Sequence, residues 1–222
     1  MTDSVPHHPQ HFAIAIDGPA ASGKSTIARE LAKRLGLIMV NSGAMYRAVT
    51  WQALKSGVDP HDPHAVIAML DRLEIACGDD GVTSTIAING TDPGDELRSP
   101  QVNAHVSAIA AIPEVRARLV ALQRDYLNRT DVVMEGRDIG SVVFPDTPYK
   151  IYVDAAEHVR AARRVDMGEV DSVAKRDAAD SRRATAPLMV AEGATVLDNS
   201  DHTVESALEA TLAILKRQGL PV

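Results

Sequence analysis

The sequence predicts an α/β fold in which helices cover both faces of a five-stranded parallel sheet. Short apolar runs that suit buried strands alternate along the chain with segments of helical periodicity. The first apolar run leads into a glycine-rich motif and then into a helix, an order typical of α/β proteins. With 222 residues, the chain is long enough for one such core and a modest appendage.

The glycine-rich motif lies between a strand predicted at residues 12–16 and a helix predicted at residues 26–35. Its residues, Gly18-Pro19-Ala20-Ala21-Ser22-Gly23-Lys24-Ser25, fit the phosphate-binding loop (P-loop) pattern G-x-x-x-x-G-K-S/T. In such a loop, backbone N–H groups turn onto phosphate oxygens at the N-terminus of a helix. Lys24 adds a positive charge at the terminal phosphates, and Ser25 offers a hydroxyl to Mg²⁺. The motif therefore predicts a nucleoside triphosphate site.

The next elements continue the alternation and then interrupt it. A buried strand is predicted at residues 37–40, and Asn41-Ser42-Gly43 begins a helix that runs to about residue 56. Asp62 and Pro63 look like the cap and first residue of another helix. Between about residues 73 and 103, two strands with a Gly-Asp-Asp-Gly turn and the turn signal Asn89-Gly90 predict a small antiparallel insertion.

The second half of the chain returns to the α/β pattern. Val102, Val106 and Ile109 have helical spacing, and Pro113 opens another helix. Strands are predicted at residues 131–134, 149–153 and 195–197, and a final helix at residues 204–217. Because ligands of open parallel sheets bind at the carboxyl ends of the strands, we expect the functional residues to gather there.

Composition excludes several classes of function. A net charge of −7 disfavours binding to polymeric nucleic acid, which depends on Lys and Arg contacts with phosphates. The apolar runs are far shorter than the roughly 18 residues that a membrane span needs. The one cysteine, Cys77, cannot form an internal disulfide. We therefore expect a cytoplasmic monomer without membrane contact, with a flexible polar tail at residues 1–11 that is unlike an export signal and holds no metal at His7, His8 and His11.

Three polar clusters narrow the chemistry. Ser42 to Arg47 could hold a second anionic group, although an ordinary capped helix also explains it. Glu135 to Asp138 ends a core strand, although alone it could be a surface salt bridge. The third cluster is a run of charged residues, for which a solvated helix face is the alternative, and consists of Arg160, Arg163, Arg164, Arg176, Asp180, Arg182 and Arg183.

Taken together, these motifs resemble the bacterial cytidylate kinases over nearly the whole chain. The resemblance also includes residues 136–140, Val143-Phe144-Pro145 and Ala186-Pro187-Leu188. It implies a P-loop kinase core at residues 12–41, 113–155 and 185–222. It further implies a nucleoside monophosphate (NMP)-binding region with a β insertion at residues 42–112 and a short helical lid at residues 156–184.

The resemblance also implies the reaction and its residues. The implied reaction transfers the γ-phosphoryl group of ATP to CMP or dCMP, with Mg²⁺ as cofactor. ATP would be bound by Gly18, Pro19, Ala20, Ala21, Ser22, Gly23, Lys24, Ser25 and Thr26. CMP would be bound by Ser42, Tyr46, Arg47, Ser107, Arg116, Arg137, Asp138, Arg176, Asp180 and Arg183. The implied catalytic residues are Lys24, Arg137, Arg160 and Arg164, with Arg163 beside them in the lid.

Within the CMP set, the family assigns Ser42, Arg47, Arg137 and Arg183 to the phosphate, Ser107, Arg116 and Asp138 to the base, and Arg176 and Asp180 to the sugar. The metal is assigned to Ser25, with Glu135 reaching it through water. Trp51, by contrast, is expected in the core rather than against a nucleotide.

Two departures from the family concern turnover and the lid. The family commonly has Asp where this chain has Asn41, which removes one charge near the metal and phosphates. The segment at residues 165–175 is also shorter than in better-known relatives.

Two alternatives stay open from the sequence. Another small-molecule P-loop kinase, of the adenylate or shikimate type, is disfavoured by the insertion and by Gly136-Arg137-Asp138. A GTP-dependent switch would need D-x-x-G and N-K-x-D elements. The sequence contains no D-x-x-G, and its nearest approach to the second element, at residues 174–177, lacks the leading Asn.

Overall fold

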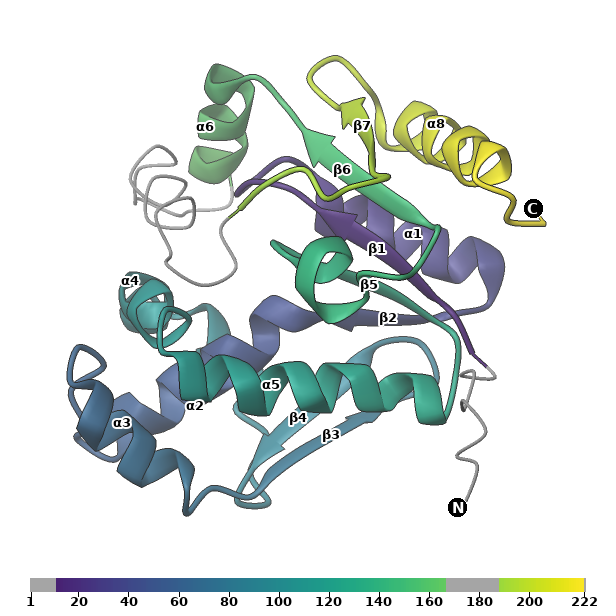
Figure 1. The fold of residues 1–222 in the computed structure, drawn as a ribbon. Helices are drawn as coiled ribbons and strands as arrows, with labels where there is room; N and C mark the ends of the chain where they lie inside the picture. The colour runs from purple at the N-terminus through teal and green to yellow at the C-terminus, as the bar shows by residue number, and fades with distance from the viewer. Residues whose placement is uncertain (1–10, 167–187, 222) are drawn as a thin grey trace, which may run out of the picture.

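The computed structural model describes residues 11–166 and 188–221, and it contains the predicted five-stranded sheet (Figure 1). The strands are β1 (Ala13–Asp17), β2 (Ile38–Asn41), β5 (Val132–Gly136), β6 (Lys150–Asp154) and β7 (Thr195–Asp198). They lie in the order β2-β5-β1-β6-β7, and every neighbouring pair is parallel. The strand that leads into the P-loop is therefore the central one.

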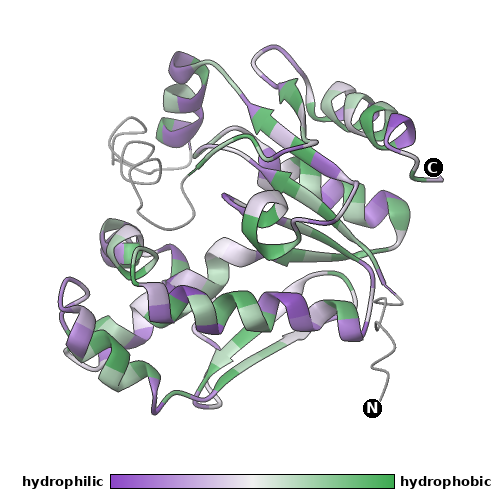
Figure 2. Ribbon diagram, viewed as in Figure 1, coloured by the Kyte–Doolittle hydropathy of each residue, from purple (hydrophilic) through white to green (hydrophobic). Residues whose placement is uncertain are grey.

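The sheet buries both of its faces, as its continuous apolar strands predicted. Ile14 and Ile16 of β1 belong to an apolar layer shared with α1 (Lys24–Leu35) and α8 (Val204–Arg217). Ala13 and Ala15 belong to the opposite layer, which contains residues of α5 (Pro113–Asp125) and of the segment after β5. Figure 2 shows hydrophobic residues concentrated along the strands and alternating with hydrophilic residues on these helices.

A second group of elements lies below the sheet in the view of Figure 1 and has its own apolar cluster. It comprises α2 (Ser42–Lys55), α3 (Pro63–Leu70), β3 (Ile75–Asp79), β4 (Ser84–Ile88) and α4 (Pro100–Ile109). Trp51 is buried in this cluster and donates a hydrogen bond of 2.5 Å from Nε1 to Glu96 Oε2, which confirms its predicted place in the core. α5 contacts both clusters, because Leu119 packs below and Val120 packs against the sheet layer.

The hairpin of β3 and β4 is joined by the turn at residues 80–83, where Asp80 Oδ1 accepts hydrogen bonds from the N–H groups of Val82 and Thr83. The hairpin turn signal at Asn89-Gly90 does not lead into a second hairpin. It closes a tight turn between Ile88 and Thr91, but no strand follows it before the short 3₁₀ helix at Gly94–Arg98. The turn at residues 80–83 also covers the edge of β2, since Met39 N–H donates to the Val82 carbonyl at 2.9 Å.

Most helix boundaries agree with the caps read from the sequence. Asp62 caps α3 by accepting from Ala65 N–H, and Pro63 is its first residue. The predicted start of α1 at Thr26 was wrong by two residues, because the N–H groups of Thr26 and Ile27 already bond to the Gly23 carbonyl. The P-loop therefore passes directly into the helix. In the described part of the chain, no helix is long and apolar enough to cross a membrane.

The chain after β6 enters α6 (Glu157–Asp166), which begins the region predicted as the lid. Arg160, Arg163 and Arg164 lie on this helix. Four other residues of the predicted basic run lie outside the described residues, namely Arg176, Asp180, Arg182 and Arg183. The division of the chain into core, NMP-binding region and lid stays a prediction.

Candidate active site

The P-loop connects β1 to α1 and depends on glycine at two crowded positions. Gly18 has φ of 152°, and a Cβ there would lie 2.0 Å from the Val153 carbonyl oxygen. Gly23 caps α1 with φ of 95°, and a Cβ there would lie 2.3 Å from Asn199 Nδ2. Both backbone conformations are strained for other residues. The loop can therefore lie close against β6 and the end of β7.

Cationic side chains hold the carbonyl groups of this loop. Lys24 Nζ donates to the Pro19 carbonyl at 3.0 Å, and Arg137 Nη1 donates to the Gly18 carbonyl at 2.7 Å. Arg160 Nη1 lies 3.3 Å from the Ala20 carbonyl. The predicted catalytic residues Lys24, Arg137 and Arg160 are thus all gathered around the loop.

One corner of the site joins the P-loop to the end of β5. Ser25 Oγ donates to Glu135 Oε1 at 3.0 Å, and Lys24 Nζ lies 4.0 Å from Glu135 Oε2. Glu135 is 4% exposed. A hydroxyl beside a carboxylate fits Mg²⁺, which is bound through one or two such oxygens together with substrate phosphates and water.

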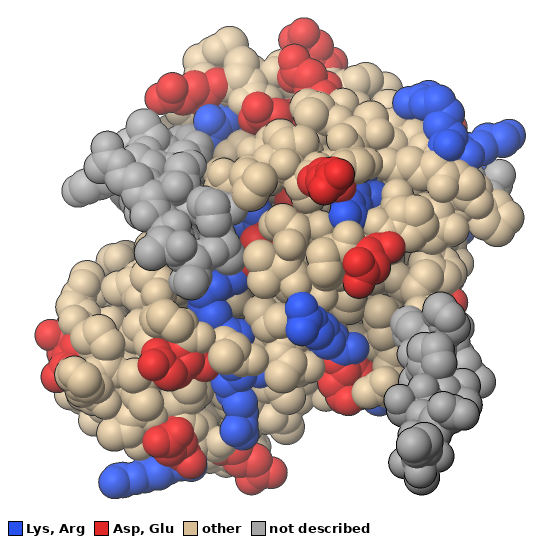
Figure 3. Space-filling view, in the orientation of Figure 1, with Lys and Arg blue, Asp and Glu red and all other residues tan. Residues whose placement is uncertain are grey.

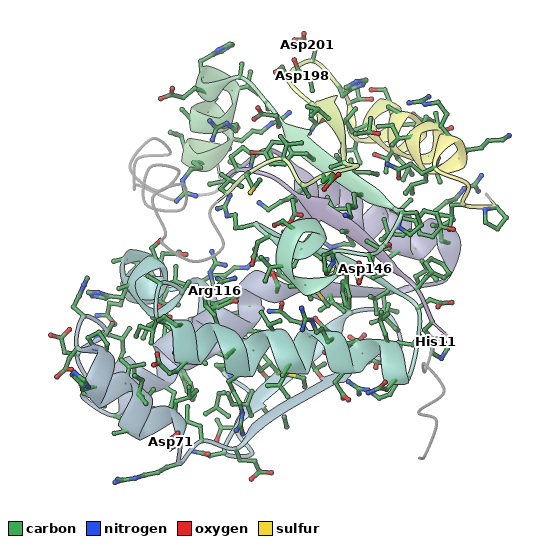
Figure 4. The ribbon with its side chains drawn as sticks, in the orientation of Figure 1. His11, Asp71, Arg116, Asp146, Asp198 and Asp201 are labelled. Atoms are coloured by element: carbon green, nitrogen blue, oxygen red, sulfur yellow. The ribbon has the colours of Figure 1, made fainter. Side chains whose placement is uncertain are left out.

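The opposite wall is built from the second group of elements. Ser42 Oγ donates to the Glu135 carbonyl at 2.8 Å, and Arg47 Nη2 donates to Asn103 Oδ1 at 3.2 Å. Arg116 lies near the start of α5 (Figure 4). Its Nη2 forms an ion pair with Asp138 Oδ2, and both residues are buried. The Arg116 guanidinium lies 5.5 Å from the centre of the Tyr46 ring. Predicted CMP residues from α2, α5 and the end of β5 thus share one wall.

A cleft of about 750 Å³ separates these two walls. Figure 3 shows Lys and Arg side chains along this boundary on the face in view. The predicted residues that line the cleft are Ala20, Ala21, Gly23, Lys24, Ser25, Thr26, Ser42, Tyr46, Arg47, Ser107, Arg116, Glu135, Arg137, Asp138 and Arg164. The described predicted residues outside that lining are Gly18, Pro19, Ser22 and Arg160. The residues predicted to bind ATP and those predicted to bind CMP therefore face the same cavity.

The adjacent residues Arg163 and Arg164 both line the cleft, although neighbours on a helix point in different directions. Arg164 is 4% exposed. Arg163 reaches the P-loop, with Nη1 at 3.1 Å from the Ser22 carbonyl. Long arginine side chains on one helix can thus reach two parts of the same site.

The sequence placed Asp17 at the end of a strand but predicted no role for it in the site. It is 3% exposed, and its carboxylate accepts hydrogen bonds of 2.7 Å from the N–H groups of Ile139 and Gly140. Burial raises its pKa to about 7, against the opposing effect of those hydrogen bonds. The nearby Asp138 carboxylate also raises this pKa, and Lys24 lowers it. Asp17 therefore anchors the segment that carries Arg137 and Asp138.

Asn103 and Asn199 were also missed. Asn103 lies on α4 and receives the hydrogen bond from Arg47. Asn199 follows β7 directly, lines the cleft and donates from Nδ2 to the Ser22 carbonyl at 2.7 Å. Its position at the carboxyl end of a predicted strand was the signal that could have found it.

Asn41, the departure from the family pattern, has a structural role at the edge of the cleft. Its Oδ1 accepts from Ala44 N–H at 3.0 Å and so caps α2, while its own N–H donates to Ser84 Oγ. Ser84 and Thr83 of the hairpin also line the cleft. The β insertion thus contributes to the wall beside Asn41.

Comparison with known proteins points to one family. A family model described as Cytidylate kinase matches residues 14–217. The chain is 40% identical over 216 residues to a cytidylate kinase of Streptomyces avermitilis, covering 92% of this chain and 93% of the relative. It is 44% identical over 207 residues to a cytidylate kinase of Corynebacterium efficiens, covering 88% and 90%. A cytidylate kinase of Clostridium botulinum is 38% identical over 218 residues, covering 93% and 99%.

Proposed function

Because the chain belongs to the cytidylate kinase family, we propose that it transfers the γ-phosphoryl group of ATP to the 5′-phosphate of CMP or dCMP. The products are ADP and CDP or dCDP. The observation that supports this most directly is one cleft with the P-loop on one wall and the buried Arg116–Asp138 pair on the other. A triphosphate on the first wall would direct its terminal phosphate toward an acceptor on the second.

The donor wall is suited to a triphosphate. The N–H groups of the loop and of the first turn of α1 would bind phosphate oxygens, with Lys24 and Arg137 adding positive charge. Ser25 would hold Mg²⁺, with Glu135 reaching the ion through water. When bound, Mg²⁺ would neutralise phosphate charge and orient the terminal phosphate.

The acceptor wall is suited to a cytosine nucleotide. Ser42, Arg47 and Arg137 would hold its phosphate. Asp138 can accept from the exocyclic amine of cytosine, and Arg116 can donate to the O2 and N3 acceptors. Uracil presents an acceptor and a donor where cytosine presents a donor and an acceptor, so it mismatches this pair.

The remaining assignments come from the family resemblance. Ser107 would complete the base site, and Tyr46 would contact CMP. Arg183 would join the phosphate site, and Arg176 and Asp180 would contact the sugar. Tolerance of a missing 2′-hydroxyl at that sugar site would make dCMP a substrate.

Catalysis would consist of positioning and charge neutralisation. Two highly charged phosphates must approach in line, and Lys24 and Arg137 lower the repulsion between them. The acceptor phosphate oxygen attacks the γ-phosphorus while the bond to the β-phosphate oxygen breaks, so no covalent enzyme intermediate is needed. Arg160 and Arg164, on α6, would cover the transferring group and exclude water, which limits hydrolysis of ATP.

The test is ADP production from MgATP by the purified chain, with CMP, dCMP, UMP, AMP, GMP, shikimate or no acceptor. We expect strong turnover with CMP and dCMP and little background. Preference for AMP or shikimate would instead support the alternative small-molecule kinases, and acceptor-independent hydrolysis would support a nucleotide-driven switch. Light scattering on the same sample tests the expected monomer.

A further inference from the structure

Five consecutive P-loop carbonyl groups, from Gly18 to Ser22, have side-chain nitrogens within hydrogen-bond distance. The first three contacts come from Arg137, Lys24 and Arg160, to which the proposed function already gives roles. The carbonyls of Ala21 and Ser22 are contacted by Arg163 and Asn199. The family resemblance places Arg163 in the lid, and it assigns no role to Asn199.

Arg163 and Asn199 contact each other and the same peptide group of the P-loop. Arg163 Nη1 donates to the Ser22 carbonyl at 3.1 Å and lies 3.5 Å from the Ala21 carbonyl. Its Nη2 donates to the Asn199 carbonyl at 2.8 Å, and Asn199 Nδ2 donates to the Ser22 carbonyl at 2.7 Å. The Ser22 carbonyl therefore receives two donors, one from α6 and one from the end of β7.

Asn199 is itself fixed by the sheet. Its N–H donates to the Asp154 carbonyl of β6 at 2.7 Å, and the residue is 5% exposed. Its side chain lies so close to the loop that a Cβ on Gly23 would be 2.3 Å from Nδ2. The amide thus contacts the loop from a rigid support.

The geometry of a peptide bond gives these contacts a consequence. In a planar trans peptide the carbonyl and the N–H group point in opposite directions. Holding the Ser22 carbonyl outward therefore holds the Gly23 N–H on the opposite side of the Ser22–Gly23 peptide. Loop N–H groups turned inward at this helix N-terminus are what bind phosphate oxygens.

We infer that Arg163 and Asn199 are positioning residues that fix the Ser22–Gly23 peptide and so set the affinity of the P-loop for the triphosphate. In this role Arg163 acts through the loop and not on the transferring phosphoryl group. The inference rests on the proposed function, because it presumes a nucleoside triphosphate at the P-loop.

The test compares four variants in the full chain. Asn199→Asp keeps the size of the side chain but replaces the donor to Ser22 with an acceptor, and Asn199→Ala removes the group. Arg163→Met removes both guanidinium contacts, and Arg163→Lys retains a cation that can reach one carbonyl. Arg118→Met, an exposed position on α5 outside the cleft, is the control.

The main readout is equilibrium binding of a non-hydrolysable ATP analogue with Mg²⁺, measured by calorimetry without an acceptor. We expect Asn199→Asp and Arg163→Met to weaken binding about tenfold, with a smaller loss for Arg163→Lys and none for Arg118→Met. Because both side chains act on one peptide, the double variant should lose less than the product of the two single effects. In kinetic assays the KM for ATP should rise while the KM for CMP stays unchanged.

Three results would overturn the inference. One is a fall in kcat for Arg163→Met with unchanged affinity for the analogue, which would place its guanidinium on the transferring group. The second is unchanged affinity for the analogue in both Asn199→Asp and Arg163→Met. The third is a loss of affinity that appears only in variants whose ligand-free form has lost thermal stability. If Asn199→Asp does not fold, Asn199→Ala carries the test. Failure of the proposed function would appear separately, as absent CMP-dependent turnover in the unaltered protein whose analogue binding still responds to the variants.

Discussion

Ser25 Oγ donates a hydrogen bond of 3.0 Å to Glu135 Oε1, which joins the first turn of α1 to the end of β5. The other carboxylate oxygen of Glu135 lies 4.0 Å from Lys24 Nζ. One buried carboxylate therefore orients two P-loop side chains of different function, a hydroxyl and an ammonium group. We therefore expect Glu135 to affect catalysis even without direct contact with a substrate.

Glu135→Gln should weaken the use of Mg²⁺. The substitution keeps the size of the side chain but removes the charge that orients Ser25 and faces Lys24. Loss of such a supporting group costs about 10- to 100-fold in activity or metal affinity. The measurement is the turnover rate as a function of free Mg²⁺ concentration, with exposed Glu209→Gln as control. An unchanged Mg²⁺ dependence would contradict the assignment.

Lys24→Ala and Arg137→Ala should each lower turnover by about a hundredfold or more while leaving the fold intact. Both side chains contact P-loop carbonyls and line the cleft where the terminal phosphates are proposed to lie. The measurement is the initial rate at saturating ATP and CMP. Circular dichroism of each variant checks that the fold is intact. Near-normal turnover in either variant would disprove the mechanism.

Arg116→Met should destabilise the protein by about 3 kcal/mol, because it leaves the buried Asp138 carboxylate without its ion-pair partner. The free energy of unfolding from urea titration is the quantity to compare. Arg118→Met on the same helix is exposed and should change it by less than about 0.5 kcal/mol. Equal stabilities of the two variants would show that the pair does not hold α5 to the end of β5.

Asp138→Asn should reduce the preference for CMP over UMP. An amide can turn its N–H₂ group toward a base, so it removes the strict acceptor that cytosine's amine requires. We expect kcat/KM for CMP to fall by about a hundredfold and the CMP-to-UMP ratio to narrow. The exposed Asp146→Asn is the matched control (Figure 4). A fall of equal size for both nucleotides would remove Asp138 from base recognition.

Asp17 should titrate near pH 7, because burial raises its pKa from 3.8 to about 7. A carboxyl group whose pKa is higher in the folded than in the unfolded protein stabilises the fold when the pH lies below its unfolded pKa. For Asp17 this contribution is lost as the pH rises from about 4 through 7. The carboxyl carbon of Asp17 can be followed by NMR over this range. The same titration in Asp17→Asn identifies the signal by its disappearance, and a midpoint below pH 5 would refute the shift.

Local sequence patterns predicted the elements well. The five strands each combine an apolar run with flanking turn residues, and the caps at Asn41 and Asp62 satisfy N–H groups of the helices that follow them. These features depend on residues within one or two turns of each other. The Asn89-Gly90 signal predicted a hairpin that is absent, and the reason is again that the signal is local. It describes a turn of four residues and not whether a partner strand follows.

The sequence by itself determined the fold class, the order of the elements, the P-loop and the family of this protein. All of these are written in neighbouring residues or in motifs of fixed spacing. Tertiary structure decided which side chains meet the loop. Asn199 contacts Ser22 across 177 residues of chain, and Asp17 contacts Gly140 across 123. Such contacts depend on the strand order β2-β5-β1-β6-β7 and on register, because only a packed sheet brings the carboxyl ends of distant strands within hydrogen-bond distance.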